Sequence, residues 1–116
     1  MRRDSLSVYF YKTDSGNEPV RDFLNELSIE DKKSIGADIR TVQIGYPVGM
    51  PLTRKFENIK KLEEIRCKIS DKRIIRIIFL VQDNSIVLLH IFIKKTQKTP
   101  AQEIDLAKKR MLSLLG

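Results

Sequence analysis

The sequence has one cysteine and one histidine, and this scarcity excludes several classes of site. Cys67 has no second cysteine within the chain, so an internal disulfide is impossible and a cysteine-based metal site is excluded. With His90 as the only histidine, a structural zinc site is not expected. We therefore expect no metal and no cofactor, and a protein of the reducing cytoplasm.

Long apolar runs and common catalytic motifs are also missing. No run approaches the roughly 20 apolar residues that are needed to cross a bilayer, so no membrane partner is expected. The N-terminal stretch 1–12 makes a poor signal peptide and a good first strand. There is no glycine-rich phosphate loop, no serine–histidine–acid set and no pair of carboxylates, and the chain has no internal repeat.

The composition is that of one globular domain spanning residues 1–116. A chain of 116 residues with 41% apolar and 32% charged residues has enough apolar side chains for one core and too few for two. A segment rich in glycine and proline, 45–53, is interpreted as a loop and not as a linker, because neither half of the chain could fold alone.

The net charge of +7 is unevenly distributed. Residues 1–53 carry 7 Lys and Arg against 8 Asp and Glu, whereas residues 54–116 carry 15 against 7. A basic face in the second half points to a polyanionic partner, either a nucleic acid or an acidic protein. The alternative is a lysine-rich surface that is simply solvated.

Hydrophobic periodicity predicts the order β-α-α-β-β-β-α. Apolar residues at helical spacing predict one helix beginning at Pro19 and a second capped by Ser28, with Asp31 in the place of the capping-box glutamate. Thr99 and Pro100 fit the start of a C-terminal helix. Strands are predicted at 6–13, at 62–69, at 73–81 and in the apolar run that starts at Ile86.

This order predicts an α+β domain, in which a mostly antiparallel sheet is covered by helices. The last three strands form a meander. Their side chains are apolar on both faces, so both faces must be covered. We expect the first two helices on one face and the C-terminal helix on the other.

Charged residues inside the predicted strands suggest a site. Regular pairing through the two hairpins of the meander places Arg66 directly opposite Arg76, on the same face of the sheet. The same count places Lys95 on that face, and it places Lys94 and His90 on the opposite face. A slip of one residue would exchange these assignments.

Two arginines side by side on a sheet are destabilising unless an anion lies between them. One interpretation is a structural ion pair with Glu64, or with Glu63 after a slip in register. The other is a bound phosphate, which the planar guanidinium group binds well. His90 is interpreted first as a packed histidine and second as a general base.

Three segments of the second half resemble the phage-related, HigB-like branch of the RelE toxin superfamily. They are LEEIRCKI, RIIRIIF and LLHIFIKKTQKTPAQEIDLAKKR, and the β-α-α order of the first half agrees with this branch. The resemblance implies a RelE-like fold and the toxin of a type II toxin–antitoxin pair. Such toxins enter the ribosome and cleave the bound mRNA through attack of a ribose 2′-hydroxyl on the adjacent phosphate, without a metal. The implied partners are the ribosome with its mRNA and a small antitoxin, expected to be a helix-turn-helix protein.

The resemblance also implies roles for individual residues. The residues implied to hold the scissile phosphate are Arg66, Arg76 and Lys95, and those implied to bind RNA are Lys60, Lys61, Lys94 and Lys98. Several members have a C-terminal tyrosine as the general base, which this chain lacks. The remaining candidates for the base are His90 and a lysine whose pKa is lowered by neighbouring cations. A further alternative is catalysis by positioning and charge alone, without a general base. The alternatives to the enzyme are a basic binding module for RNA or protein, without catalysis, and an inactive phage-derived relative of the toxin.

Overall fold

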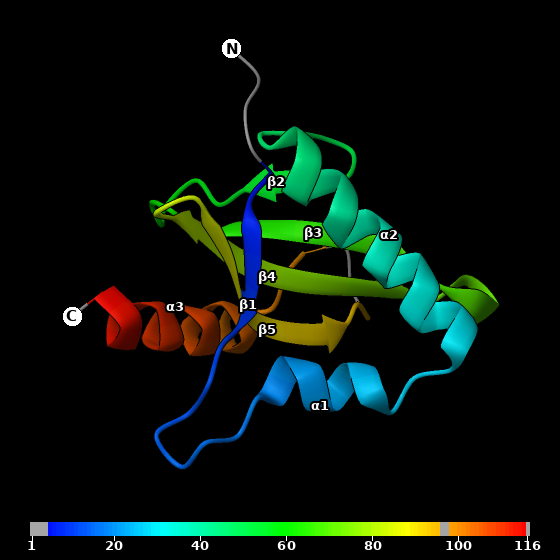
Figure 1. Ribbon diagram of the computed structural model, residues 1–116, viewed down its shortest axis with the longest axis horizontal. Coiled ribbons are helices and arrows are strands. Elements are labelled where there is room, and N and C mark those ends of the chain that lie inside the picture. The colour runs from blue at the N-terminus through cyan, green and yellow to red at the C-terminus, as the bar shows by residue number, and fades with distance from the viewer. Residues whose placement is uncertain (1–4, 96–97, 116) are drawn as a thin grey trace.

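The computed structural model describes residues 5–95 and 98–115, and these form one five-stranded sheet with three α-helices (Figure 1). The helices are α1 (Pro19–Asn25), α2 (Ile29–Gly45) and α3 (Ala101–Leu115). The strands are β1 (Ser7–Phe10), β2 (Thr53–Lys55), β3 (Glu63–Lys68), β4 (Ile74–Gln82) and β5 (Ser85–Ile93). The strand order is β1-β5-β4-β3-β2, with β1 parallel to β5 and the other pairs antiparallel. The predicted α+β class is confirmed, and β2 is a short strand that the sequence did not predict.

Both faces of the sheet are covered by helices, as predicted. On one face Val20 of α1 and Ile35 of α2 pack with Ile65 and Ile77 of the sheet, and Figure 1 shows α2 crossing in front of β3 and β4, with α1 below β5. On the other face Met111 and its neighbours in α3 pack with apolar side chains of β4 and β5. Each face buries a separate apolar cluster, and this burial accounts for the apolar character of the two inner strands.

The hairpins of the meander form where the sequence predicted them. Arg66 of β3 lies directly opposite Arg76 of β4. At the next turn Asp83 and Asn84 both have positive φ, at 51° and 61°. Short polar side chains tolerate this conformation, which suits a two-residue hairpin turn. The predicted opposition of the two arginines is therefore confirmed.

The β4–β5 pair contains an irregularity that changes the register of β5. Ile78 pairs with His90, but the next residue, Phe79, pairs with Leu88, so one extra residue of β5 is accommodated between them. Such a bulge reverses the alternation of side chains beyond it. The prediction of regular pairing is therefore wrong for the end of β5: Arg76 lies opposite Phe92, and the residues on its face beyond the bulge have even numbers.

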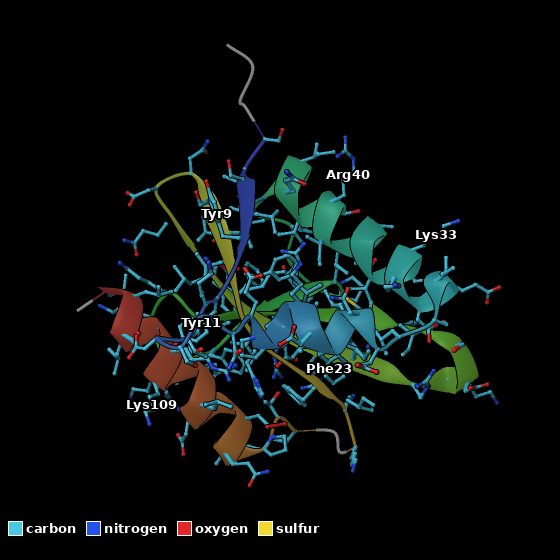
Figure 2. All side chains as sticks on the ribbon, turned by 60° about the horizontal axis from the view of Figure 1, so that its bottom comes forward. Tyr9, Tyr11, Phe23, Lys33, Arg40 and Lys109 are labelled. Carbon is cyan, nitrogen blue, oxygen red and sulfur yellow. The ribbon has the colours of Figure 1, made fainter. Side chains whose placement is uncertain are left out.

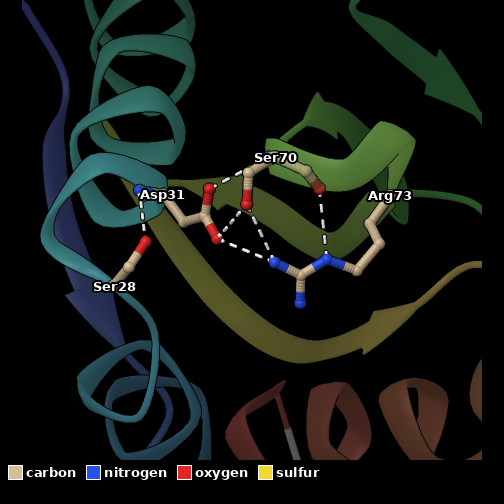
Figure 3. A network of polar contacts seen from close by, with 4 residues as sticks. All are labelled: Ser28, Asp31, Ser70 and Arg73. Atoms are coloured by element: carbon tan, nitrogen blue, oxygen red, sulfur yellow. Dashed lines mark hydrogen bonds and ion pairs between the residues drawn. The ribbon is translucent and has the colours of Figure 1, made fainter.

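The first turn of α2 is tied to the β3–β4 connection by the Asp31 carboxylate (Figure 3). The Ser28 hydroxyl accepts a hydrogen bond from the Asp31 amide at 3.1 Å, so the predicted cap is present. The carboxylate, however, does not complete a capping box. It accepts hydrogen bonds from the amide and hydroxyl of Ser70 and from Arg73, all at 3.0 Å. These bonds lower the pKa of Asp31, and the Ser70 amide contributes most.

The outer surfaces of the helices carry many of the basic side chains. Figure 2 shows Lys33 and Arg40 pointing outward from α2, and Lys109 pointing outward from α3. Part of the positive charge is therefore solvated surface, one of the two interpretations that the sequence left open. Among the described helices none is both long enough and apolar enough to cross a bilayer.

Candidate anion-binding site

A hollow of about 260 Å³ lies where β2, β3 and β4 meet the end of β5, on the face of the sheet that α3 covers. Its charged lining consists of four cationic side chains and one carboxylate: Arg54, Arg66, Arg76, Lys94 and Glu64. We call it the basic hollow. Because cations dominate its walls, it suits an anion such as a phosphate group.

One side of the basic hollow is a loop between α2 and β2. Gly49 has a φ of 86°, which favours glycine, and its amide donates a hydrogen bond to the Thr53 hydroxyl at 2.8 Å. The Thr53 amide in turn donates to the Gly49 carbonyl oxygen at 3.0 Å. These bonds turn the chain into β2, which brings Arg54 into the site beside Met50, Pro51 and Leu52 of the loop.

A buried network fixes Arg76 at the floor of the hollow. The Arg76 Nη1 forms an ion pair with Glu64 at 2.9 Å and donates to the Thr99 hydroxyl at 2.6 Å. The Thr99 hydroxyl donates to the other oxygen of Glu64 at 2.7 Å. All three residues are buried, at 4 to 5% exposure. The ion pair with Glu64, which the sequence left open, is therefore present, and it ties the segment before α3 to the sheet.

Arg66 differs from Arg76, its neighbour across the ladder, in that it has no ion pair to Glu64. Its Nε is buried and has no hydrogen-bond partner among the described residues, and no ion pair to Arg66 is found within the same ranges. Glu64 is shared between Arg76 and, at 3.9 Å, the half-exposed Arg54. Among the described residues neither Arg66 nor Lys94 has an ion-pair partner, and the N–H groups of Arg66 are suited to an incoming anion.

Lys94 completes the cationic lining. The bulge in β5 turns its side chain to the face of Arg76, and its amide donates to the Ile74 carbonyl oxygen at 2.7 Å. Desolvation lowers the pKa of Lys94, and the nearby charges of Arg76 and Arg66 lower it further. The pKa of Arg76 is lowered mainly by burial, while Glu64 opposes that shift.

The prediction that placed Lys95 beside the arginines, and Lys94 and His90 on the other face, is wrong because of the bulge. Lys95 is exposed and does not line the basic hollow. His90 lies on the face that α3 covers, where its Nε2 is 3.0 Å from a carboxylate oxygen of Glu103. The ring of His90 also stacks on Phe92. It is a packed histidine outside the lining of the hollow, as its first interpretation had it.

The remaining predicted RNA-binding lysines are spread over two other hollows. Lys60 and Lys61 line one hollow together with Tyr46, which donates a hydrogen bond to Glu63. This hollow shares no lining residue with the basic hollow. Lys98 lines a different one, which adjoins the basic hollow. The structure therefore does not bring these three lysines together with the two arginines.

Metal ligation and thiol chemistry find little support in the side chains present. Within residues 5–95 and 98–115 no three His, Cys, Asp or Glu side chains gather in a way that could hold a metal ion. Cys67 is buried among apolar side chains. Burial raises the pKa of its thiol, and Asp38 raises it further, so the nucleophilic thiolate is disfavoured.

Two residues of the site were missed by sequence reasoning. Arg54 lies on β2, a strand of three residues that leaves almost no periodic signal. Thr99 looked like a helix cap, but its hydroxyl bonds to Arg76 and Glu64. The alternation in β3 puts Glu64 and Arg66 on one face, which indicates a charged site there, but it gives no sign that Arg54 and Thr99 reach that site from other segments.

The fold and the basic hollow define a small α+β domain with a cationic hollow on one face of its sheet. Residues 22–112 match the model of the phage-derived, Gp49-like protein family (DUF891), and the chain belongs to this family. This family is assigned to the RelE-like toxins of toxin–antitoxin systems. No curated protein matches the chain.

Proposed function

We propose that this protein is the toxin of a type II toxin–antitoxin pair, of the HigB-like kind, and that it stops translation by cleaving mRNA on the ribosome. The observation that carries the proposal is the basic hollow, where four cations surround one carboxylate and the buried Nε of Arg66 has no partner among the described residues. An RNA phosphate supplies the anion that this arrangement needs.

The proposed reaction needs only the substrate and cationic side chains. The ribose 2′-oxygen attacks the adjacent phosphorus, and the bond from phosphorus to the 5′-oxygen of the next nucleotide breaks. A 2′,3′-cyclic phosphate and a free 5′-hydroxyl result. Negative charge grows on the non-bridging oxygens as the fifth bond forms, and Arg66 and Lys94 stabilise that charge. Arg76, held by Glu64, supplies a fixed positive charge beside them.

Proton transfer in this scheme falls to Lys94. A lowered pKa enlarges the neutral fraction of its amine, and a neutral amine can take the proton of the 2′-hydroxyl. The resulting ammonium can then return a proton to the departing 5′-oxygen. Since His90 is paired with Glu103 outside the lining of the hollow, it has no part in this scheme.

The proposed partners follow from the proposed toxin function. The basic second half would face the ribosome and its mRNA in the cytoplasm, and a small helix-turn-helix antitoxin would cover the site when the toxin is held inactive. A second candidate is a non-catalytic basic module, or an inactive relative of the toxin. One observation favours it: Arg76 already has a carboxylate partner within the fold.

Mapping of mRNA 5′ ends in a translating extract tests the proposal. Wild type is expected to produce new ends, and Arg66→Ala and Lys94→Ala to lower the cleavage rate by about a hundredfold, the usual cost of removing one group that stabilises a growing oxyanion. Lys95→Ala is the matched control and is expected to cleave like wild type. Absence of cleavage by wild type would leave the non-catalytic module, and unchanged cleavage by Arg66→Ala would refute the site.

A further inference from the structure

A second, larger hollow adjoins the basic hollow. Its volume is about 460 Å³, and its lining includes Met50, Arg54, Phe56, Asn58, Lys98 and Ile104. Two of these residues, Met50 and Arg54, also line the basic hollow. The two hollows are also connected by Thr99, which lines the larger one and hydrogen-bonds to Arg76 and Glu64 of the smaller one.

The two hollows differ in chemistry. The basic hollow is lined mainly by charged groups, whereas the larger one presents the carbon atoms of Met50, Phe56 and Ile104 together with the amide of Asn58. A flat heterocycle has apolar faces and an edge of donors and acceptors. The apolar side chains suit such faces, and a carboxamide offers both a donor and an acceptor to the edge.

Arg54 forms the boundary between the two hollows. Its guanidinium lies 5.8 Å from the centroid of the Phe56 ring, and its side chain is 47% exposed. Met50 beside it is 77% exposed, although it is a large apolar residue. A guanidinium plane backed by an aromatic ring is a surface on which nucleobases stack.

We propose that the larger hollow, which we call the base pocket, binds the nucleobase of a nucleotide whose phosphate occupies the basic hollow. This inference rests on the proposed function, and it names the residues that would determine which RNA base the protein prefers. A base is joined to its phosphate through one ribose, so its pocket must share a wall with the phosphate site. The base pocket does so through Met50 and Arg54.

Another hollow also adjoins the basic hollow, but it suits a base less well. It has a volume of about 430 Å³, shares Pro51, Leu52 and Arg66 with the basic hollow, and has Asp38 in its lining. Each of these two hollows has one carboxylate in its lining, Asp38 here and Glu57 in the base pocket, but this hollow has no aromatic side chain on which a base could stack. It therefore provides the matched control for the experiment.

Binding of short RNA probes tests the base pocket independently of cleavage. The probes are dinucleotides with a 2′-O-methyl group at the attacking ribose, each of the four bases being compared with an abasic form. We expect wild type to bind at least one base-bearing probe about fivefold more tightly than the abasic probe, the lower end of what one stacked base contributes. Met50→Ala and Asn58→Ala, both at exposed positions, should abolish that difference. Ser34→Ala in the control hollow should preserve it.

The outcomes separate this inference from the proposed function. Equal binding of base-bearing and abasic probes by wild type, with loss of both in Arg66→Ala, would refute the base pocket and leave the phosphate site standing. A preference that disappears in Ser34→Ala and persists in Asn58→Ala would move the base to the other hollow and also refute the proposal. Failure of wild type to bind any probe would refute both the base pocket and the phosphate site.

Discussion

Replacing Glu64 with glutamine tests whether the floor of the basic hollow is a low-dielectric site. The change keeps the shape of the side chain and an oxygen that can accept from Thr99, but it removes the charge that faces Arg76 at 2.9 Å. Arg76 is only 5% exposed, and an arginine does not lose its proton near neutral pH. The cost of an uncompensated buried charge therefore falls on folding, and we expect Glu64→Gln to lose about 3–5 kcal/mol of unfolding free energy.

Urea unfolding followed by far-UV circular dichroism measures this loss. With an m-value of about 1–3 kcal/mol/M, the midpoint should fall by roughly 2 M. Glu57→Gln is the matched control, because it removes an exposed carboxylate, and it should stay within about 0.5 kcal/mol of wild type.

The double variant Glu64→Gln with Arg76→Gln should lose less than the sum of the two single losses, by about 1 kcal/mol or more, because neither charge is then left buried alone. A loss below about 1 kcal/mol in Glu64→Gln would refute the reasoning. It would mean that solvent compensates the charge of Arg76 and that electrostatic contacts in the hollow are no stronger than in water.

Three further predictions concern the Asp31 network, the core and Lys94. The folded-state pKa of Asp31 lies below the usual 3.8, so the stabilisation from its ionised carboxylate is present above pH 3.8 and is lost as the pH falls through the folded value. The unfolding free energy measured at decreasing pH should show this loss in wild type and not in Asp31→Asn. Ile77→Asp places a charge at a fully buried position of β4 and should unfold the domain, whereas Ile93→Asp, at 36% exposure, should fold cooperatively. Because the pKa of Lys94 is lowered, the single-turnover cleavage rate should rise with pH and level off below 10.5, and this rise should be absent in Lys94→Arg.

Much of the fold could be predicted from the sequence because local signals and burial agree. The Ser28 cap, the Asp83–Asn84 turn and the opposition of Arg66 and Arg76 all follow from short-range chemistry and regular pairing. Coverage of both faces followed from strands that are apolar on both sides. The site needed more than this, because Arg54 reaches it from a segment with almost no periodic signal and Thr99 from one that indicates only a helix start.

The decisive error, the choice of Lys95 over Lys94, has a physical cause in the sheet. Regular alternation cannot put Leu89 and Phe92 into the same apolar cluster, since they are three residues apart, yet both pack against α3. Only the bulge allows this. A strand with one polar face would have revealed the change of phase as a break in its pattern. Apart from His90, the residues of β5 close to the bulge are apolar on both faces, so the apolar pattern looks the same in either register.

The bulge therefore links core packing to the chemistry of the basic hollow. It lets β5 fill the α3 face with Leu89 and Phe92, and the same change of phase turns Lys94 toward Arg66 and Arg76. In regular pairing Lys94 would face the other side, and the hollow would hold three arginines and Glu64 without an amine whose pKa is lowered by desolvation and by neighbouring cations. The orientation of Lys94, the residue proposed for proton transfer, thus depends on one extra residue in the buried strand β5. Apolar packing at a distance from the site sets the position of that extra residue.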